Sequence, residues 1–399
     1  MNYNNTADLD GIFPPIRLLF CPFPSLNILH RMMKRNIYVL IKPASSMCNM
    51  RCKYCFYSDV SDHRESKSFG IMQPETVLAL VRKTLSYASG GDVTYAFQGG
   101  EPLVAGETFF RGFSETVDSQ NRQHSSIHYS LQTNGTLLTD SFCAYLKERD
   151  YLVGVSLDGP RGLNDANRVY SDGSGSFDQV RQGIALLRKH DVPFNILAVM
   201  THETVAYLPK LRTFFENYNL NDLQFITCLE PFGTVPFSSG YAMTNDDYYE
   251  LNKMLFDWYL ERNQAGQRLS IRHLDNLMRM LNGYRPEMCA SMGFCTGQLV
   301  VEGNGNCYPC DFYCDDTHLL GNIRTHSLEE MSTGSAMQQF VLPSRPVDDA
   351  CKQCAVGSLC RGGCRRERDI CNDGTPQRNI YCEGRKKFLQ YVLRKLNIR

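Results

Sequence analysis

The sequence predicts an α/β fold in which a parallel sheet, open or barrel-like, is followed by a smaller cysteine-rich domain. Short β-branched runs alternate with amphipathic helical patterns in the first part of the chain, as in consecutive βα units. Polar or glycine-rich motifs directly follow most of these runs, which is where parallel α/β folds build their sites. The alternation stops near residue 232, and most of the cysteines follow from residue 289 onward.

Six runs are expected to be strands because they are short and rich in Val, Ile, Tyr and Phe. They cover residues 37–42, 93–97, 127–132, 152–157, 194–200 and 223–228. Helices are expected where apolar residues recur at helical spacing. These stretches are 74–88, 177–190, 246–262, 271–281 and a terminal 386–399.

Five polar motifs lie at or just after the ends of predicted strands. In chain order they read CNMRCKYC, QGGEP, TNG, SLDGP and LEP. Each alone is typical of an ordinary turn. Because the carboxyl ends of parallel strands share one edge of a sheet, their common position predicts a single site there.

The composition is that of a globular protein without net charge. With 399 residues the chain exceeds the size of one hydrophobic core, so two or three domains are expected. Lys plus Arg equals Asp plus Glu at 42 each, and no overall field favours nucleic acid or an anionic membrane. The 17 cysteines are odd in number and tightly grouped, which indicates the reducing cytoplasm rather than a disulfide framework.

Three cysteines follow the first predicted strand at C-x3-C-x2-C spacing. They are Cys48, Cys52 and Cys55. A structural zinc or an ordinary iron–sulfur cluster takes four protein ligands, so three neighbouring thiols indicate a cubane cluster with one iron left open. A substrate or cofactor would bind at that iron, where the chemistry would start.

A second array of eight cysteines is large enough for two four-thiolate sites. It consists of Cys289, Cys295, Cys310, Cys351, Cys354, Cys360, Cys364 and Cys382. Two zinc ions would satisfy the same count, so a zinc-binding interaction protein without redox activity is an alternative. The open trio favours iron–sulfur chemistry throughout. Most of the remaining cysteines are expected to be small buried hydrophobes: Cys21, Cys143, Cys228, Cys307, Cys314 and Cys371.

These motifs together resemble a known superfamily. Tyr54 precedes the last cysteine of the trio, residues 99–101 read GGE, and the second array contains C-x9-G-x4-C followed by C-x2-C-x5-C-x3-C and a final cysteine. The combination resembles radical S-adenosylmethionine enzymes with a C-terminal SPASM domain. Within that superfamily, the stretches IKPASSMCNMRCKYCFY, AFQGGEPLVAG and YPCDFY are similar to anaerobic sulfatase-maturating enzymes.

The resemblance covers the chain from about Met33 and implies a partial (β/α)6 TIM-like barrel with a cysteine-rich SPASM domain. Residues 1–32 have no counterpart in it, and we expect them to be disordered or to precede the true start. The implied parts are a radical S-adenosylmethionine barrel at 33–232, a helical connection at 233–288, a SPASM domain with two auxiliary clusters at 289–385, and a C-terminal helix at 386–399.

The resemblance also implies the cofactor sites. The trio would hold a catalytic 4Fe–4S cluster whose open iron binds S-adenosylmethionine, and the other cofactor contacts would be Tyr54, Gly100, Ser156, Arg168 and Leu229. The residue types suit these roles, since a glycine lets backbone approach a ligand, a serine can bond a ribose and an arginine can pair with a carboxylate. A first auxiliary 4Fe–4S cluster would be held by Cys289, Cys295, Cys310 and Cys364. A second would be held by Cys351, Cys354, Cys360 and Cys382.

Asp311 matches the general base of this family. It follows Cys310, and a neighbouring cluster ligand would fix its backbone, as a desolvated base requires. Asp275 is the second candidate, and its alternative role is a salt bridge with Arg272 or Arg279.

The implied reaction is the oxidation of a peptidyl Cys or Ser of a sulfatase to Cα-formylglycine. Asp311 would take a proton and the auxiliary clusters an electron, while Gln98 and Tyr57 could line the substrate channel or only pack. The expected partners are an unfolded Cys/Ser-x-Pro-x-Arg segment and a low-potential electron donor such as flavodoxin or ferredoxin. Thioether or carbon–carbon crosslinking of a ribosomal peptide is the alternative reaction of SPASM enzymes. The sequence leaves the choice between Cys and Ser open.

Overall fold

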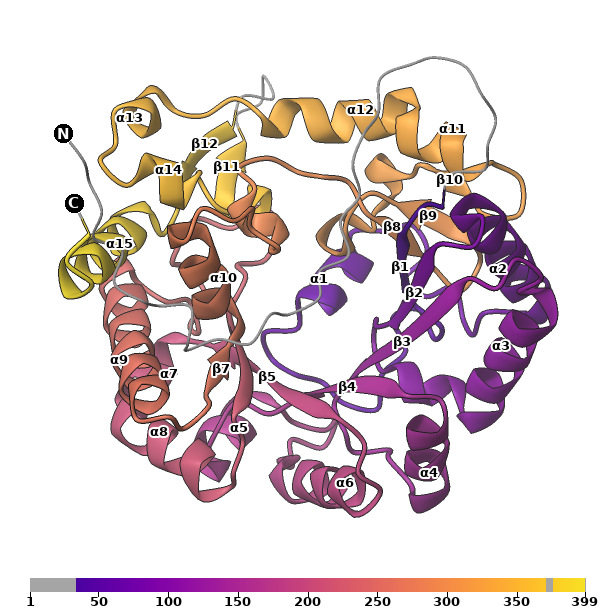
Figure 1. The fold of residues 1–399 in the computed structure, drawn as a ribbon, viewed down its shortest axis with the longest axis horizontal. Coiled ribbons are helices and arrows are strands. Elements are labelled where there is room, and N and C mark those ends of the chain that lie inside the picture. Colours follow the sequence, from indigo (N-terminus) through magenta and orange to yellow (C-terminus); the bar gives the residue numbers. More distant parts are fainter. Residues whose placement is uncertain (1–33, 371–375, 399) are drawn as a thin grey trace, which may run out of the picture.

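The computed structural model describes residues 34–370 and 376–398 (Figure 1). The N-terminal extension therefore lies outside the described residues. The predicted fold class is confirmed, because six consecutive strands alternate with helices in one parallel sheet. These strands are β1 (Ile37–Ile41), β2 (Asp92–Phe97), β3 (Ser126–Thr133), β4 (Tyr151–Ser156), β5 (Phe194–Met200) and β6 (Asp222–Thr227).

Helices connect these strands, and most of them cover the outer side of a curved sheet that forms an arc in Figure 1, whereas α1 lies within the arc. In chain order they are α1 (Phe56–Asp62), α2 (Pro74–Ala88), α3 (Glu107–Gln120), α4 (Asp140–Glu148), α5 (Arg161–Asn167), α6 (Phe177–Lys189), α7 (His202–Ala206) and α8 (Leu208–Asn217). The predicted helix at 74–88 matches α2, which has proline at its first position where no backbone donor is needed. The predicted helix at 177–190 matches α6.

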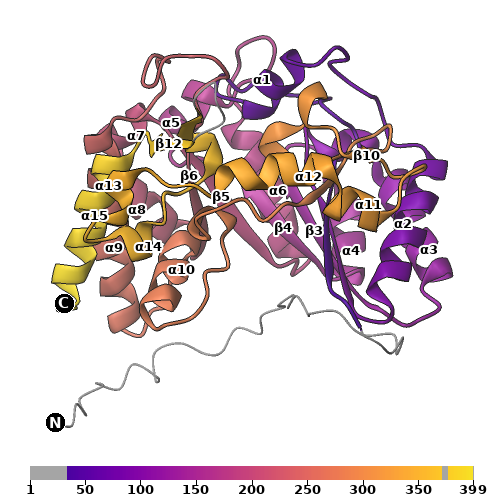
Figure 2. The ribbon, with the colours of Figure 1, turned by 90° about the horizontal axis from the view of Figure 1, so that it is seen from above.

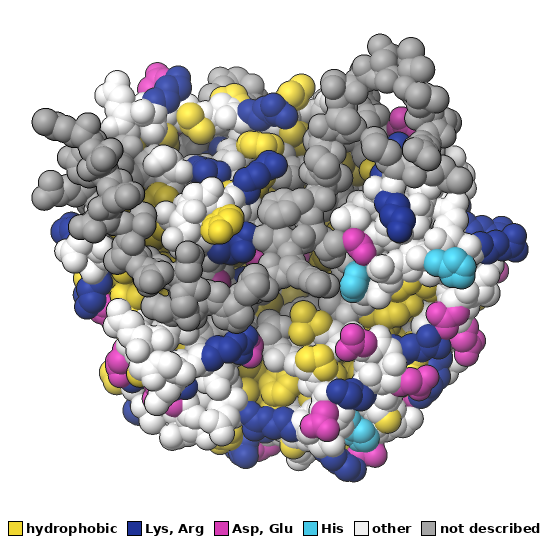
Figure 3. Space-filling view, in the orientation of Figure 1, with side chains coloured by type: hydrophobic (Ala, Val, Ile, Leu, Met, Phe, Trp, Pro, Cys, Tyr) yellow, Lys and Arg dark blue, Asp and Glu magenta, His cyan; other side chains and the backbone are white. Residues whose placement is uncertain are grey.

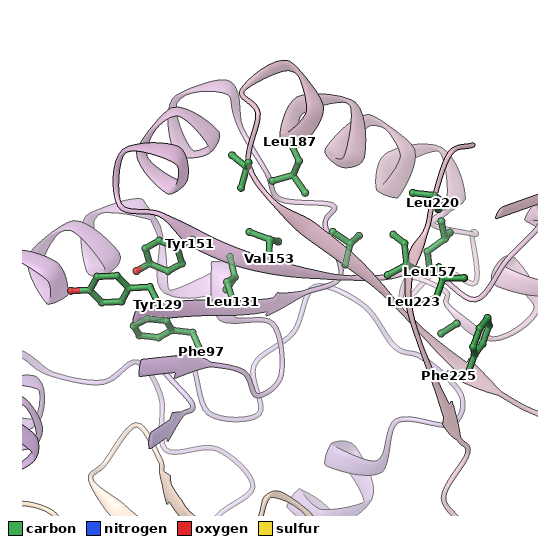
Figure 4. Packing of buried hydrophobic residues seen from close by; sticks show 14 of the residues in the cluster. Phe97, Tyr129, Leu131, Tyr151, Val153, Leu157, Leu187, Leu220, Leu223 and Phe225 are labelled. Atoms are coloured by element: carbon green, nitrogen blue, oxygen red, sulfur yellow. The ribbon is translucent and has the colours of Figure 1, made fainter. Parts of the chain in front are cut away.

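The hydrophobic core lies between the sheet and these outer helices. Tyr129 and Tyr151 stack there with ring centroids 4.9 Å apart, and Val153 and Leu187 pack nearby without exposure (Figure 4). Neighbouring strand residues point to opposite faces. Leu152, between two buried residues of β4, is therefore 51% exposed on the inner face of the arc. In Figure 3, hydrophobic side chains gather toward the centre of the arc and charged ones dominate its rim.

The C-terminal part extends the same sheet and lies across the open side of the arc (Figure 2). Strand β8 (Leu299–Val301) pairs in parallel with β1, and the sheet order is β10-β9-β8-β1-β2-β3-β4-β5-β6-β7. The additional strands are β7 (Ser270–Ile271), β9 (Asn306–Tyr308), β10 (Gly321–Asn322), β11 (Arg368–Ile370) and β12 (Pro376–Asn379). All are four residues long or shorter, too short for a periodic pattern to predict them.

The remaining helices join the two ends of the arc. They are α9 (Asn245–Gln264), α10 (Arg272–Leu281), α11 (Leu328–Thr333), α12 (Ser335–Val341), α13 (Asp349–Lys352), α14 (Gly357–Cys360) and α15 (Cys382–Lys395). Helix α11 contacts α2 at one end, and α15 packs along α9 at the other. The terminal helix thus begins at Cys382, earlier than predicted, and buries Phe388 and Val392 as expected. Among the described residues, no helix is both long enough and apolar enough to cross a membrane.

Candidate active site

The cysteine trio lies in the loop that joins β1 to α1, at the carboxyl edge of the sheet. Burial, the largest effect, raises the pKa of the Cys48 thiol to about 12, and Cys52 and Cys55 lie close enough to raise it further. Burial likewise raises the pKa of Cys52 to about 11, against the opposing effect of Arg168. Buried thiols ionise readily only beside a metal or another cation, so this donor set suits an iron–sulfur cluster.

The GGE motif supports this loop from beneath. Gly100 N–H donates to Ser45 O at 2.9 Å, and Glu101 N–H donates to Met47 O at 2.8 Å. A Cβ atom at Gly100 would lie 2.8 Å from the carbonyl carbon of Met47 and closer still to its oxygen. The need for glycine at 100 therefore comes from the close approach of the loop that carries the cysteine trio.

Glu101 ties the loop to the end of β3. Its buried carboxylate accepts hydrogen bonds from Leu103 N at 3.0 Å, Thr133 Oγ1 at 2.7 Å and Asn134 N at 2.7 Å. Burial nevertheless raises the pKa of Glu101 to about 7, although these three donors lower it. Glu101, which follows β2, thus joins the loop after β1 through its backbone N–H and the end of β3 through its carboxylate.

The opposite side of the trio is held by a buried ion pair. Arg168 Nε donates to Asp158 Oδ1 at 3.0 Å, with side chains 7% and 2% exposed, and Tyr54 OH donates to the same carboxylate. Burial is the largest single effect and opposes the charge on Arg168, but Asp158, Tyr54 and Cys52 together outweigh it, so the pKa of the guanidinium is raised. Two predicted cofactor contacts, Tyr54 and Arg168, therefore share one carboxylate, a partner that was not predicted from the sequence.

The other predicted cofactor contacts lie at neighbouring strand ends. Ser156 ends β4, and its hydroxyl accepts a hydrogen bond from Gln132 Nε2 at 3.2 Å. Leu229 follows β6 and is half-buried. All predicted contacts thus lie at the carboxyl edge of the sheet, and their roles toward a cofactor stay predictions.

Asp311 lies in this region and is held by two side chains from the barrel. Lys42 Nζ pairs with its Oδ1, and Gln98 Nε2 donates to its Oδ2 at 2.7 Å. Asp311 is 7% exposed and Lys42 is completely buried. The sequence left open whether Gln98 lines the substrate channel or only packs, whereas the role of Lys42 was not predicted because a single lysine after a strand resembles a surface charge.

Lys42 itself belongs to a longer buried chain of charges. Its ammonium lies 3.6 Å from the centroid of the Tyr57 ring, and Tyr57 OH donates to Glu302 Oε1. Arg64 Nη1 donates to the same oxygen at 2.7 Å, and both of these side chains have no exposure. Burial would lower the pKa of Lys42, but Asp311 first, with Cys314 and Glu302, raises it.

The second candidate base, Asp275, has different partners from those expected. It accepts hydrogen bonds from Tyr259 OH at 2.8 Å and Ser270 Oγ at 2.6 Å. Arg272 instead pairs with Glu287 at 3.3 Å. The expected salt bridge with Arg272 or Arg279 is therefore wrong, because two nearby hydroxyl groups already satisfy the carboxylate.

The eight later cysteines influence one another within two sets, and their assignment as ligands of two auxiliary clusters stays a prediction. Beyond the effect of burial, Cys310 is perturbed by Cys364 and Cys295, and Cys364 by Cys289 and Cys295, with the pKa of Cys310 and Cys364 raised. In the other group, Cys351 is perturbed by Cys360 and Cys354, and Cys382 by Cys360 and Cys351, again with raised pKa. Within the described residues, 34–370 and 376–398, no three His, Cys, Asp or Glu side chains form a group that could hold a single metal ion.

Buried guanidinium groups surround these thiols. Arg365 Nε, Arg368 Nε and Nη1, and Arg385 Nε are buried without a hydrogen-bond partner. Arg365 and Arg368 both lie close enough to Cys295 to lower the pKa of its thiol, and Cys360 is among the groups that raise the pKa of Arg385 against the larger, opposing effect of burial. Unpaired donors of this kind suit anionic, sulfide-containing groups at both positions.

The remaining cysteines behave as predicted wherever the structure describes them. Four of them are at most 2% exposed: Cys143, Cys228, Cys307 and Cys314. Cys21 and Cys371 lie outside the described residues. All cysteines at 34–370 and 376–398 are free thiols.

Family models match the two parts of the chain that carry these sites. The model of the radical SAM superfamily matches residues 43–215, and the model of the SPASM iron–sulfur cluster-binding domain matches residues 292–355. The first range contains the trio, and the second contains Asp311.

Individual relatives match almost the whole chain. The cysteine-type anaerobic sulfatase-maturating enzyme of Clostridium perfringens is 40% identical over 358 residues, which cover 90% of this chain and 96% of the relative. The serine-type enzyme of Bacteroides thetaiotaomicron is 27% identical over 372 residues, 89% of each chain. The solved structure of native anSMEcpe with bound AdoMet and Cp18Cys peptide has 38% identity and a TM-score of 0.86, covering 91% of this chain and 98% of that one.

Proposed function

The chain belongs to the radical S-adenosylmethionine enzymes with a SPASM domain, in the family of anaerobic sulfatase-maturating enzymes, and we propose that it oxidises a peptidyl cysteine of a sulfatase to Cα-formylglycine. The observation that carries the proposal is the placement of Asp311. This carboxylate follows a proposed cluster ligand and is held by the ends of β1 and β2, directly where the trio's loop begins.

The chemistry requires removal of one hydrogen atom, one proton and one electron from the substrate. Taken from a Cβ–SH group, they leave a thioaldehyde, which water hydrolyses to an aldehyde and hydrogen sulfide. When bound, the catalytic cluster and S-adenosylmethionine supply the radical that removes the hydrogen atom, and the auxiliary clusters accept the electron. Asp311 accepts the proton at its carboxylate, which its buried surroundings shield from water.

The proposed cluster ligands are the three groups of cysteines predicted from the sequence. Cys48, Cys52 and Cys55 hold the catalytic cluster, and the two later groups hold the auxiliary clusters. Around the cofactor, Tyr54 and Arg168 are fixed through Asp158, so their positions do not depend on the ligand. Gly100, Ser156 and Leu229 complete the proposed cofactor contacts.

Cysteine is the favoured substrate residue over serine. The cysteine-type relative is 40% identical to this chain, whereas the serine-type relative is 27% identical. A thiol also loses its proton more readily than an alcohol does, which suits a carboxylate as the proton acceptor. The peptide bound to anSMEcpe supports a peptide segment as the substrate. We further propose a flavodoxin or ferredoxin as electron donor and a cytoplasmic location, where free thiols persist.

The test incubates reduced, iron-loaded protein and S-adenosylmethionine with two peptides that differ only in C-x-P-x-R or S-x-P-x-R. The proposal expects an aldehyde on the Cys peptide, detected by hydrazine labelling and mass spectrometry. Cleavage of S-adenosylmethionine without aldehyde on either peptide would refute it, and a crosslinked peptide would favour the alternative SPASM reaction. A chain that binds zinc and no iron would support the interaction protein instead.

The Asp311→Asn variant checks the assignment of the base. It should still transfer deuterium from a Cβ-deuterated peptide to 5′-deoxyadenosine, because hydrogen abstraction does not need the carboxylate. Its aldehyde yield should fall by about 10²–10⁴-fold, the usual contribution of a general base. Full aldehyde formation by this variant would exclude Asp311 as the proton acceptor.

A further inference from the structure

The two side chains that donate hydrogen bonds to the Asp311 carboxylate belong to residues that follow the ends of two neighbouring strands. Ile41 of β1 is in register with Phe97 of β2, and Gln98 N–H donates to Ile41 O at 2.9 Å. Lys42 and Gln98, which directly follow β1 and β2, therefore lie side by side. Because the two donors are adjacent, each can reach a different oxygen of one carboxylate.

We propose that Lys42 is the positioning residue for the Asp311 carboxylate and that, together with Gln98, it orients the oxygen that receives the substrate proton. The inference rests on the proposed function of Asp311 and adds to it the residues that fix its geometry. A carboxylate offers about four acceptor positions, so two remain free after these two bonds. With one donor on each oxygen, the carboxyl plane cannot rotate, and the free positions point in fixed directions.

Lys42 can act in this way because its own position is determined on every side. Its ammonium lies against the Tyr57 ring at 3.6 Å, and Tyr57 is fixed by Glu302 and Arg64. The four charged groups, Lys42, Arg64, Glu302 and Asp311, sum to zero and are all buried. A buried charge is tolerated when it is paired and hydrogen-bonded, so the lysine has no alternative position with comparable stability.

The arrangement also connects the site of hydrogen abstraction to the site of proton removal. Tyr57 belongs to α1, which begins directly after Cys55, whereas Glu302 and Asp311 belong to the C-terminal part of the chain. Lys42 contacts both parts: it lies against the Tyr57 ring of α1 and pairs with Asp311 of the C-terminal part. A shift of about 1 Å at a reacting group can cost on the order of 10²-fold in rate, so loss of this contact should affect proton removal strongly.

The test compares Lys42→Met and Gln98→Met holoenzymes with wild type on a Cβ-deuterated C-x-P-x-R peptide. Lys67→Met is the matched control, since the Lys67 side chain is 72% exposed and pairs with the exposed Asp62 at 2.5 Å. Iron content shows whether each variant assembles its clusters. Gln98→Met serves as the second variant because Gln98 is only half-buried and its loss is easier for the fold to accommodate.

The expected result is a split between two products. Deuterated 5′-deoxyadenosine should form at close to the wild-type rate and with unchanged KM for the peptide, whereas aldehyde per 5′-deoxyadenosine should fall at least tenfold in both variants and stay unchanged in Lys67→Met. A parallel fall of both products would show a merely structural role and overturn the inference, as would an unchanged ratio. If wild type itself makes no aldehyde, the proposed function fails instead.

Discussion

Replacement of Gly100 by alanine should remove the catalytic cluster while leaving the rest of the protein intact. The added Cβ would lie 2.8 Å from two carbonyl carbons, those of Ser46 and Met47, whereas ordinary contact begins near 3.4 Å. These atoms belong to the backbone, so no side-chain rotation can relieve the clash. Met47 directly precedes Cys48, and the loop must therefore move at its first ligand.

The cost can be worked from the contacts at this position. Two backbone hydrogen bonds, Gly100 N–H to Ser45 O and Glu101 N–H to Met47 O, would be strained or lost. At about 0.5–1.5 kcal/mol each, with about 1–3 kcal/mol for overpacking, the clash costs about 2–6 kcal/mol. The free energy of unfolding of an ordinary domain is about 5–15 kcal/mol, so displacement of the loop requires less free energy than unfolding of the protein.

The assay is iron content together with electron paramagnetic resonance of the reduced protein. Gly100→Ala should lose about one third of its iron, the share of one cluster among three, and should no longer cleave S-adenosylmethionine. Gly112→Ala is the control, because Gly112 lies within α3 and a Cβ there meets nothing within 4 Å. Full iron content and normal cofactor cleavage in Gly100→Ala would refute the argument that the cluster loop needs this glycine.

Two further predictions concern buried carboxylates. Because burial raises the pKa of Glu101 from 4.5 to about 7, the folded metal-free chain holds more protons than the unfolded chain between these values. Its free energy of unfolding should therefore fall as the pH rises through this window, by about 3 kcal/mol across the whole window. In urea unfolding at several pH values, Glu101→Gln should show a weaker dependence of stability on pH than wild type. Equal pH dependence in both proteins would contradict the prediction. Glu302→Gln leaves the unexposed Arg64 side chain without a counter-charge and should lower the free energy of unfolding in urea by about 3–5 kcal/mol. The control, Glu329→Gln, changes an exposed residue and should have little effect. A loss below about 1 kcal/mol in Glu302→Gln would contradict a stabilising role of the Arg64–Glu302 pair.

The sequence predicts the parts of this protein whose pattern is local. Six strands could be located because each is a short run of β-branched and aromatic residues, and the cysteine groups could be recognised because their spacing is fixed by the metal group they suit. The burial of Cys143, Cys228, Cys307 and Cys314 also followed from residue type alone. These predictions do not depend on which strands pair with one another.

The rest depends on pairings between distant segments. Lys42 and Asp311 are separated by 269 positions, and Tyr57 and Glu302 by 245, so no spacing rule could join them. Asp275 shows the converse, since local spacing suggested an arginine partner but Tyr259 and Ser270 are closer in space. Short strands such as β8 were missed for the same reason, because tertiary pairing rather than periodicity produces them.

Strand β1 explains why the two ends of the chain form one site. It pairs with β2 on one side and with β8 on the other, both in parallel, and its carboxyl end leads directly into the cysteine loop. Val301 of β8 is in register with Ile41, so Glu302, the next residue, reaches the level of Lys42. Strand β9 then runs antiparallel to β8, and Gln298 N–H donates to Pro309 O at 2.7 Å, so Cys310 and Asp311 follow near the amino end of β8, where the Lys42 and Gln98 side chains reach the Asp311 carboxylate. Because backbone hydrogen bonds of one continuous sheet fix these positions, the spacing between the trio and Asp311 is set by strand register and not by a hinge between domains.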